Sequence, residues 1–359
     1  MTPVSSDPLH HYTIWVLYPA LETTDPNLEY YYDFSQSLDE YTAVFEALKL
    51  DWHWQPVLLK DAENIVSSIN SSTSKPLVLN LCDGDETNGT PGLTILKLLN
   101  KAGLPFTGAD EFFYEITTSK IPMKRSLEDA GVPTPSWWIP EPEIPQSLLL
   151  DFPMILKPAI SGGSMGVSIK NVVNNFSQLE QRLLELKSGY RGWNLDAGGI
   201  LAESFIEGRE YTSFIVGSSS SPETLVVFEP VERVFHASLP EKEKFLSFDR
   251  LWEIYEEEAP MPNNENFYEY EKVDGTLADA IKKISFDAYL AVKGIGYGRL
   301  DLRMDATGNL TVLEVNAQCG LSEDENFTSI GAILKASNVS FTRLIEMILH
   351  ETLERFNKA

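Results

Sequence analysis

The fold of this protein is indicated most clearly by residues 298–316, which read GRLDLRMDATGNLTVLEVN. Polar and apolar residues alternate on both sides of the turn-forming segment 305–309, and this pattern predicts a β-hairpin. If Asp301 lies opposite Glu314, one face of the hairpin carries Arg299, Asp301, Arg303, Val312, Glu314 and Asn316. The other, apolar face then carries Leu300, Leu302, Met304, Leu313 and Val315.

The polar face of this hairpin suits a cation. Two carboxylates that face each other across a strand pair repel unless positive charge lies between them. Asp301, Glu314 and Asn316 offer hard oxygen ligands, and Mg²⁺ is the usual ion for such a set when phosphates complete its shell. A hairpin with one solvated face explains the alternation equally well, so the hairpin alone leaves both interpretations open.

Composition narrows the class of protein. The chain has 359 residues and a formal net charge of −25, which argues against binding to nucleic acid or to an anionic membrane through a broad basic surface. Only two cysteines are present, Cys82 and Cys319, so no disulfide framework is expected and a reducing compartment fits. Neither a signal pattern nor a membrane-length apolar run occurs, and a cytoplasmic protein is expected.

The first part of the chain alternates predicted strands and helices, which is typical of a small α/β domain. A strand is expected at residues 12–18 and an amphipathic helix at 38–48, with Ser37 as its N-cap. Further strands are predicted at 56–59 and 77–82, and a short helix at 94–101. The polar loop 83–89 follows the last of these strands, at the end of a parallel sheet where ligands usually bind.

A second unit is predicted to begin near Thr117, with a helix at 119–130 and a proline-rich surface connection at 141–153. A strand is expected at 154–157, and a second strand is expected directly after the glycines of 161–166. Two further strands are expected at 200–206 and 211–216, joined by a turn at 207–208. Residues 236–266 are polar and weakly periodic, which indicates a long loop or lid. Helices are predicted at 277–292 and 341–356.

Glycines are concentrated in residues 161–166, Ser-Gly-Gly-Ser-Met-Gly, between two predicted strands. Glycines allow backbone N–H groups to approach an anion closely, and Lys157 could reach the same anion. This is neither a Walker A sequence nor a dinucleotide-binding fingerprint, because no helix follows the glycines. When the segment is taken alone, an ordinary glycine-rich hairpin explains it as well as an anion-binding loop does.

Taken in order, these motifs resemble the ATP-grasp fold, and most closely the D-alanine–D-alanine ligase family. Residues 155–166 are similar to that family's phosphate-binding loop, residues 203–210 to its adenosine-binding segment, and residues 313–316 to its metal-binding end. The resemblance spans roughly residues 77–345. It implies an α/β fold with an N-terminal α/β pre-ATP-grasp domain (1–116), a central ATP-grasp subdomain with the glycine loop (117–207) and a C-terminal subdomain with a lid loop and the metal-binding hairpin (208–359).

The resemblance also implies roles for individual residues. Lys120 and Lys157 would contact the nucleotide phosphates, which Gly162, Gly163 and Gly166 would cover. The adenosine would be held by Glu203, Ser204, Ile206 and Glu210, the last at the ribose. Two Mg²⁺ ions, or Mn²⁺ in their place, would be bound by Asp301, Glu314 and Asn316. The catalytic residues would be Arg299, Ser164 and Lys244, the last reaching in from the lid, and the substrate residues would be Gly320, Ser322 and Glu325.

The expected activity is ATP-dependent ligation of a carboxylate and an amine through an acyl phosphate, on small molecules such as amino acids. The resemblance also allows a homodimer. The chain departs from the family at its substrate end, because no glutamate lines up after the first strand and Glu325 falls roughly where the family has a serine. We therefore expect an acceptor other than D-alanine, with a positive charge near residues 323–325. The alternatives are a D-alanine–D-alanine ligase proper, a small-molecule kinase and a catalytically silent ATP-binding regulator.

Overall fold

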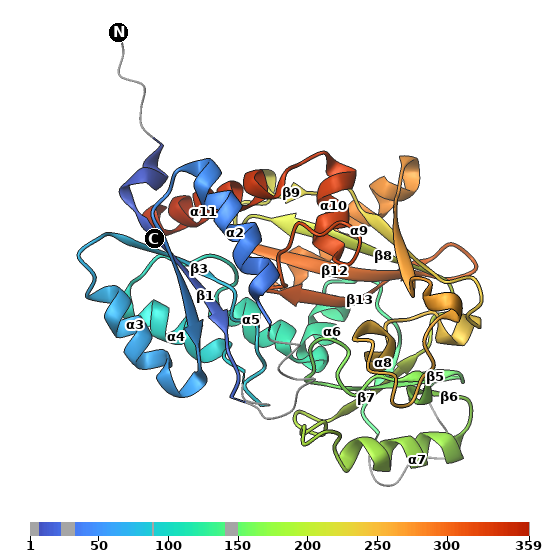
Figure 1. Cartoon of the computed structure of the whole chain (residues 1–359). Coiled ribbons are helices and arrows are strands. Elements are labelled where there is room, and N and C mark those ends of the chain that lie inside the picture. The colour runs from blue at the N-terminus through green and yellow to red at the C-terminus, as the bar shows by residue number, and fades with distance from the viewer. Residues whose placement is uncertain (1–6, 23–32, 88–89, 141–149, 359) are drawn as a thin grey trace.

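Three β-sheets follow one another along the chain in the computed structural model, which describes residues 7–22, 33–87, 90–140 and 150–358 (Figure 1). The first sheet is parallel, with strand order β2-β1-β3, and consists of β1 (Thr13–Pro19), β2 (Trp52–Val57) and β3 (Pro76–Asn80). Its helices are α2 (Ser35–Leu48), α3 (Ala62–Asn70) and α4 (Leu93–Ala102). Side chains of β1 alternate between two cores, so α2 and the C-terminal helix α11 (Phe341–Lys358) cover one face, and α3 and α4 cover the other.

The second sheet is antiparallel and has the order β4-β7-β5-β6. Its strands are β4 (Trp137–Trp138), β5 (Met154–Pro158), β6 (Val172–Val173) and β7 (Ile200–Ser204). Met154 and Leu156 pack against α7 (Phe176–Lys187), which lies on the outer side of this sheet in Figure 1. Because side chains alternate along a strand, Ile155 and Lys157 point to the opposite face. That face borders the site described below.

The third sheet is antiparallel, has the order β11-β10-β8-β12-β13, and gains β9 beside β8. Its strands are β8 (Arg209–Val216), β9 (Val226–Val227), β10 (Val231–Phe235), β11 (Tyr268–Lys272), β12 (Tyr297–Met304) and β13 (Leu310–Ala317). One face packs against helices α5 (Glu111–Thr118), α6 (Lys120–Asp129) and α9 (Gly275–Ala291). Helix α10 (Ser329–Ser337) packs on the other face. We propose that the chain divides into three parts at residues 116 and 207. Helix α5 spans the first of these boundaries and packs with α6 on this sheet.

Several predicted elements have different limits in the structure. Helix α2 begins at Ser35, so Ser37 is inside the helix and is not its N-cap. The helix predicted at 119–130 starts one residue later, because Ser119 is extended and separates α6 from α5. The turn at 207–208 does not join paired strands, since β7 belongs to the second sheet and β8 to the third. Most of the proline-rich connection predicted at 141–153 lies outside the described residues.

Two predicted loop regions contain short helices. No strand directly follows the glycines of 161–166; a turn and the 3₁₀ helix η3 (Ile169–Asn171) precede β6. The 236–266 segment contains η5 (Glu241–Glu243), α8 (Phe248–Leu251) and η6 (Pro262–Asn264). Helices α3, α5, α7 and α10 and strands β4 and β9 to β11 were not predicted. The remaining short helices are η1 (Pro8–His11), η2 (Leu59–Asp61) and η4 (Pro222–Thr224).

No helix in the described part of the chain combines the length and the apolar character needed to cross a bilayer.

Candidate active site

A cavity of about 590 Å³ is lined by residues of the second and third sheets and by loops after β3 and β13. Most of the predicted site residues line it, namely Lys120, Lys157, Gly162, Gly163, Ser164, Glu203, Ser204, Ile206, Glu210, Arg299, Asp301, Glu314, Asn316, Gly320 and Ser322. Lys244, Gly166 and Glu325 are not among the lining residues. The predicted residues therefore converge from segments up to 202 positions apart in the sequence, from Lys120 to Ser322.

The metal-binding hairpin has the predicted register at its polar end, since Asp301 lies opposite Glu314 and Arg299 opposite Asn316. A β-bulge follows, and Leu302 then pairs with Val312. On β13 the predicted faces are wrong beyond this bulge: Val312 is fully buried in the core, and Leu313 lines the cavity. A bulge places two residues of one strand opposite one of its partner, so the side chains beyond it change face on the bulged strand only.

Asp301 is the centre of a charged group on this hairpin. Its Oδ2 accepts hydrogen bonds from Arg299 at 3.0 Å and from the Asn316 amide at 3.1 Å, and its Oδ1 accepts one from Thr212 at 3.0 Å. Burial raises the pKa of Asp301, but the nearby guanidinium groups of Arg299 and Arg233 outweigh it and hold the pKa below the usual value. The carboxylate is therefore ionised at neutral pH, as a metal ligand requires.

Lys120 connects the predicted metal site to the glycine loop. Its ammonium lies 3.0 Å from Glu314 and donates to the Ser161 carbonyl at 3.2 Å. Asp301, Glu314 and Asn316 supply the oxygen atoms that Mg²⁺ prefers, and the two carboxylates are now partnered by Arg299 and Lys120. These residues fit a divalent cation, because an ion bound between the carboxylates would free both cations to contact phosphate oxygens.

Glu203 lies between two lysines at the other side of the cavity. Its carboxylate is 1% exposed and pairs with Lys124 at 2.8 Å and with Lys157. Burial raises the pKa of Glu203, but the two ammonium groups have the larger, opposite effect. The pKa is therefore about 2, below the ordinary value of 4.5. Lys124 is fully buried, and burial lowers its pKa despite the attraction of Glu203. Lys157 is thus fixed at the cavity wall by a partner that is ionised at neutral pH.

Glu210, predicted at the ribose, is flanked by two buried arginines. It pairs with Arg233 and, at 3.1 Å, with Arg303. Arg303 also donates to the Ile206 carbonyl at 2.7 Å and to the Lys244 carbonyl. Arg303 therefore joins the predicted adenine-binding segment to the lid loop through backbone atoms of both.

The glycine loop is held in a conformation that favours glycine. Gly163 and Gly166 have φ values of 53° and 75°, and a Cβ at Gly166 would lie 2.8 Å from Leu195. Gly166 thus allows close packing beneath the loop, which explains why it does not line the cavity. Ser164 also has a positive φ of 63° and is one of the residues that line the cavity.

The lid segment contacts this loop directly. The Trp252 indole donates to the Gly163 carbonyl at 2.8 Å, and the Phe248 amide donates to the Val167 carbonyl at 2.8 Å. The Glu258 carboxylate accepts from the Ile169 amide at 2.9 Å. The lid and the glycine loop are therefore connected through several hydrogen bonds.

The W252F variant tests this connection. Phenylalanine keeps an aromatic ring at the lid but removes the donor to Gly163. We expect the apparent KM for ATP to rise roughly threefold to tenfold, because a net hydrogen bond contributes about 0.5–1.5 kcal/mol. Steady-state kinetics of ADP formation measure this change. W137F is the control, since Trp137 bonds to Glu128 and does not line the cavity; equal effects of both variants would contradict the assignment.

The substrate end differs from the prediction at one residue. Glu325 is exposed and pairs with Lys335 at 2.6 Å, outside the cavity. Thr328 and Ser329, at the N-terminus of α10, line the cavity instead. Ser322 also lines it, and its hydroxyl donates to the buried Glu40 of α2 at 2.7 Å. The argument for a cationic acceptor at residues 323–325 therefore loses its structural basis.

Lys244 also differs from its predicted position. Its ammonium pairs with Glu241 at 2.5 Å, and the neighbouring Phe245 lines the cavity. Phe245 packs edge-to-face on Phe205 with ring centroids 5.9 Å apart. The two rings thus form an apolar wall at the end of the cavity where adenine is predicted to bind. Lys244 contributes only its backbone carbonyl there, which accepts a hydrogen bond from Arg303.

Other lining residues were not predicted as site residues. The acidic and basic ones are Asp83, Arg233 and Arg303. Asp83 lies in the polar loop after β3 that the sequence marked as a ligand-binding position. Arg303 was placed on the polar face of the hairpin, whereas nothing in the sequence around Arg233 distinguishes it from a surface arginine.

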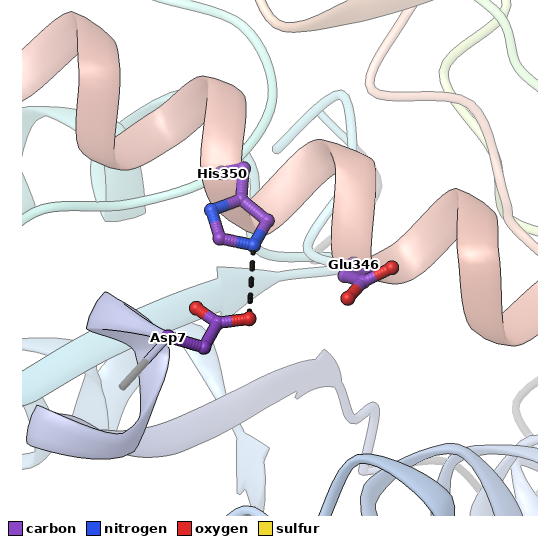
Figure 2. A group of neighbouring side chains, drawn as sticks. All are labelled: Asp7, Glu346 and His350. Atoms are coloured by element: carbon purple, nitrogen blue, oxygen red, sulfur yellow. Dashed lines mark ion pairs between the residues drawn. The ribbon is translucent and has the colours of Figure 1, made fainter. Parts of the chain in front are cut away.

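Among the described residues, Asp7, Glu346 and His350 have potential ligand atoms within 4.8 Å of one another, and none of the three lines the cavity (Figure 2). The ring Nε2 of His350 lies 3.3 Å from Asp7. Asp7 accepts a hydrogen bond from the Leu9 amide at 3.0 Å and Glu346 pairs with Arg343 at 2.6 Å. These contacts explain why the three side chains lie close together: they connect η1 to α11.

Comparison with known proteins agrees with this geometry. A family model described as D-ala D-ala ligase C-terminus matches residues 141–350. The D-alanine–D-alanine ligase of Stutzerimonas stutzeri is 26% identical over 263 residues, covering 72% of this chain and 73% of the relative. The uncharacterized protein y4sG of Sinorhizobium fredii is 27% identical over 309 residues, covering 83% of this chain and 81% of the relative.

Among solved structures, the D-alanine–D-alanine ligase of Bacillus anthracis complexed with ATP superposes with a TM-score of 0.68. The two sequences are 18% identical, and the match covers 97% of this chain and 99% of the other. This likeness shows the fold. The family match, which spans more than half of the chain, and the shared architecture establish that the protein belongs to the D-alanine–D-alanine ligase family and has the ATP-grasp fold.

Proposed function

We propose that the protein is an ATP-dependent ligase that joins the carboxylate of one small molecule to the amine of another. The observation that supports this most directly is the position of Lys120, whose ammonium bridges the glycine loop at Ser161 and the metal-binding hairpin at Glu314. A triphosphate placed against this ammonium would contact the glycine loop on one side and a metal held by Asp301, Glu314 and Asn316 on the other. That is the arrangement phosphoryl transfer requires.

The proposed reaction has two steps. A carboxylate oxygen of the first substrate attacks the γ-phosphorus of ATP, ADP leaves, and an acyl phosphate forms. The nitrogen of the amine then attacks the acyl carbon, inorganic phosphate leaves, and the amine loses a proton. Bound divalent cations would neutralise charge on the phosphate oxygens. Arg299, close to Asp301, would stabilise the charge that develops on the transferred phosphoryl group and on the tetrahedral species.

The remaining residues position the nucleotide and exclude water. Lys157, fixed by Glu203, and Lys120 would hold the phosphates, and the backbone of the glycine loop would cover them. Phe205 and Phe245 would enclose the adenine, with Ser204 and Ile206 supplying backbone contacts, and Glu210 would meet the ribose. Closure of the lid through Trp252 and Phe248 would protect the acyl phosphate from hydrolysis.

A D-alanine–D-alanine ligase proper is the second candidate. The name of the Stutzerimonas stutzeri relative favours it. The N-terminus of α10, with Thr328 and Ser329 at the cavity wall, also favours it, because helix N-termini attract carboxylates such as that of a second amino acid.

A substrate panel with coupled detection of ADP and mass spectrometry of the products tests these proposals. The panel combines D- and L-amino acids, other small carboxylates and amines, singly and in pairs, with ATP and Mg²⁺. For a ligase, we expect ADP only when a carboxylate and an amine are both present, together with a condensed product. D-Alanine alone giving the dipeptide would identify the second candidate, a phosphorylated hydroxyl compound would indicate a kinase, and ATP binding without turnover would indicate a regulator.

A further inference from the structure

A second group of potential metal ligands lies outside the cavity, where η1 meets the C-terminal helix α11. Asp7 directly precedes η1, and Glu346 and His350 belong to α11. One potential ligand atom of each side chain lies within 4.8 Å of the other two, and all three residues are half-buried. Figure 2 shows Asp7 and His350 facing each other from these two helices. The group thus combines one imidazole nitrogen with two carboxylates.

The backbone sets the positions of these side chains. Glu346 and His350 are four residues apart on α11, so they lie one turn apart on the same face of the helix. Asp7 is the N-cap of η1, and its Oδ1 accepts a hydrogen bond from the Leu9 amide at 3.0 Å. Leu9 is 1% exposed and belongs to the same hydrophobic core as Leu349 of α11. This packing places the second Asp7 oxygen, Oδ2, beside His350.

The contact between Asp7 and His350 differs from an ordinary histidine–carboxylate pair. Oδ2 of Asp7 is 3.3 Å from Nε2 of His350, and no hydrogen bond joins these two described side chains. His236, in contrast, is hydrogen bonded to Glu265 at 2.6 Å. Ligand atoms of a tetrahedral Zn²⁺ ion with bonds of about 2.0–2.2 Å lie about 3.3–3.6 Å apart. The separation of Asp7 and His350 therefore fits two ligands of one metal ion.

Glu346 can supply the third ligand. Its Oε2 pairs with Arg343 at 2.6 Å, and the arginine side chain is exposed. Exposed ion pairs contribute little free energy, so rotation of the Glu346 side chain toward Asp7 and His350 costs little. Without a cation, the carboxylates of Asp7 and Glu346 repel each other at this distance. A divalent cation between them removes the repulsion.

The kinds of ligand atom in the group select the metal. Mg²⁺ and Ca²⁺ are bound by oxygen ligands, whereas Zn²⁺ accepts histidine nitrogen together with carboxylate oxygen. Three protein ligands leave the fourth position of a tetrahedral ion for water, which reaches a half-buried group. The group therefore differs in chemistry from the oxygen ligands of the metal-binding hairpin, Asp301, Glu314 and Asn316.

We propose that Asp7, Glu346 and His350 bind one Zn²⁺ ion that joins η1 to α11. The ion would hold the segment before β1 against the helix that covers one face of the first sheet. Its effect is on stability, because a metal that binds the folded chain in preference to the unfolded chain shifts the equilibrium toward the fold. This role is separate from the proposed ligase function and does not depend on it.

Thermal unfolding of the full-length protein, first stripped of metal with a chelator, tests the proposal. Zn²⁺ is titrated in the presence of excess Mg²⁺, which competes for the oxygen ligands of the hairpin. H350Q and D7N each replace a ligand by an amide of similar shape. H10A is the matched control, because His10 is an exposed histidine of η1 outside the group. Isothermal titration calorimetry measures the number of Zn²⁺ ions bound.

For the wild type, we expect one bound Zn²⁺ and a rise in Tm of roughly 3–5 °C at a Zn²⁺ concentration about a hundredfold above Kd. In H350Q and D7N, this rise should fall below about 1 °C. Loss of an outer partner of a ligand already weakens metal binding about tenfold to a hundredfold, and loss of a ligand costs at least as much. H10A and D301N should keep the wild-type rise.

Three results would overturn the proposal. The first is the absence of a Zn²⁺-dependent rise in the wild type, and the second is an equal rise in H350Q and D7N. The third is loss of the rise in H10A or D301N, which would place the ion at exposed histidines or at the metal-binding hairpin. Each variant is compared with itself, with and without Zn²⁺, so a change in its stability without metal does not affect the outcome.

Discussion

Replacing Asp301 by asparagine is expected to lower the rate of ADP formation by about a hundredfold or more. Asparagine has nearly the same shape, and its single carbonyl oxygen can still accept the hydrogen bond from Arg299, while its NH2 group can donate to the Thr212 hydroxyl. It lacks the negative charge that a divalent cation requires, and loss of such electrostatic stabilisation costs on the order of a hundredfold to a thousandfold. Steady-state kinetics at several Mg²⁺ concentrations measure the effect, and we expect the Mg²⁺ requirement to move to higher concentration.

D305N is the matched control for this variant. Asp305 is in the turn of the same hairpin, is exposed, and accepts hydrogen bonds from the amides of Thr307 at 2.8 Å and Asn309 at 2.9 Å. Asparagine can accept the same bonds, so D305N should keep wild-type activity and Mg²⁺ dependence. Activity of D301N within threefold of the wild type at saturating ATP would show that Asp301 does not bind the metal.

The E203Q variant is expected to destabilise the protein by about 3–5 kcal/mol, because removing one partner of a buried ion pair leaves an uncompensated charge. Here two ammonium groups, those of Lys124 and Lys157, lose their carboxylate at once. Urea-induced unfolding followed by circular dichroism measures the change. The KM for ATP should rise as well, since Lys157 would no longer be fixed at the cavity wall.

The pH dependence of this effect has a definite sign. The pKa of Glu203 is about 2 in the folded protein against an ordinary value of 4.5, so the ion pairs contribute fully above about pH 4.5. Their contribution is lost as the pH falls from 4.5 toward 2, because Glu203 then binds a proton in the folded state as well. The difference in stability between the wild type and E203Q should therefore be constant near neutrality and become smaller in acid.

Two further variants separate this effect from a general loss of surface charge. E257Q removes one partner of the exposed Lys170–Glu257 pair and should cost less than about 1 kcal/mol. Adding K124M to E203Q removes one of the unpaired buried cations and should restore part of the lost stability. If E203Q is no less stable than E257Q, the buried lysine–glutamate group is not an important source of stability.

The metal-binding hairpin illustrates how far sequence patterns reach. Alternation and turn chemistry predicted it, and the facing of Asp301 and Glu314 is confirmed by the strand register. The bulge was missed because its cause lies elsewhere in the chain. The Val312 amide donates to the Pro133 carbonyl at 2.8 Å, and its carbonyl accepts from Thr134 at 2.9 Å, so a distant segment redirects Val312 into the core.

The buried charged residues, in contrast, could not be predicted from sequence patterns. Lys124 looks in sequence like any solvated lysine of a helix, and Glu203 was assigned to adenine contacts alone. Only the folded chain brings α6 against β7, where the two side chains and Lys157 form one buried group. Local sequence patterns depend on periodicity, and periodicity does not encode which charged side chains of distant elements will meet.

The sequence by itself determined the α/β character of the chain, the order of the motifs and most of the residues that meet at the cavity, because hydrophobic periodicity, glycine loops and turn residues act over short distances. The tertiary structure alone decided which hydroxyl and carboxylate groups face the substrate. It placed Asp83 and Thr328 at the cavity wall and turned Glu325 and the Lys244 ammonium away. The reason is that side-chain direction at a site depends on how elements far apart in the chain pack together.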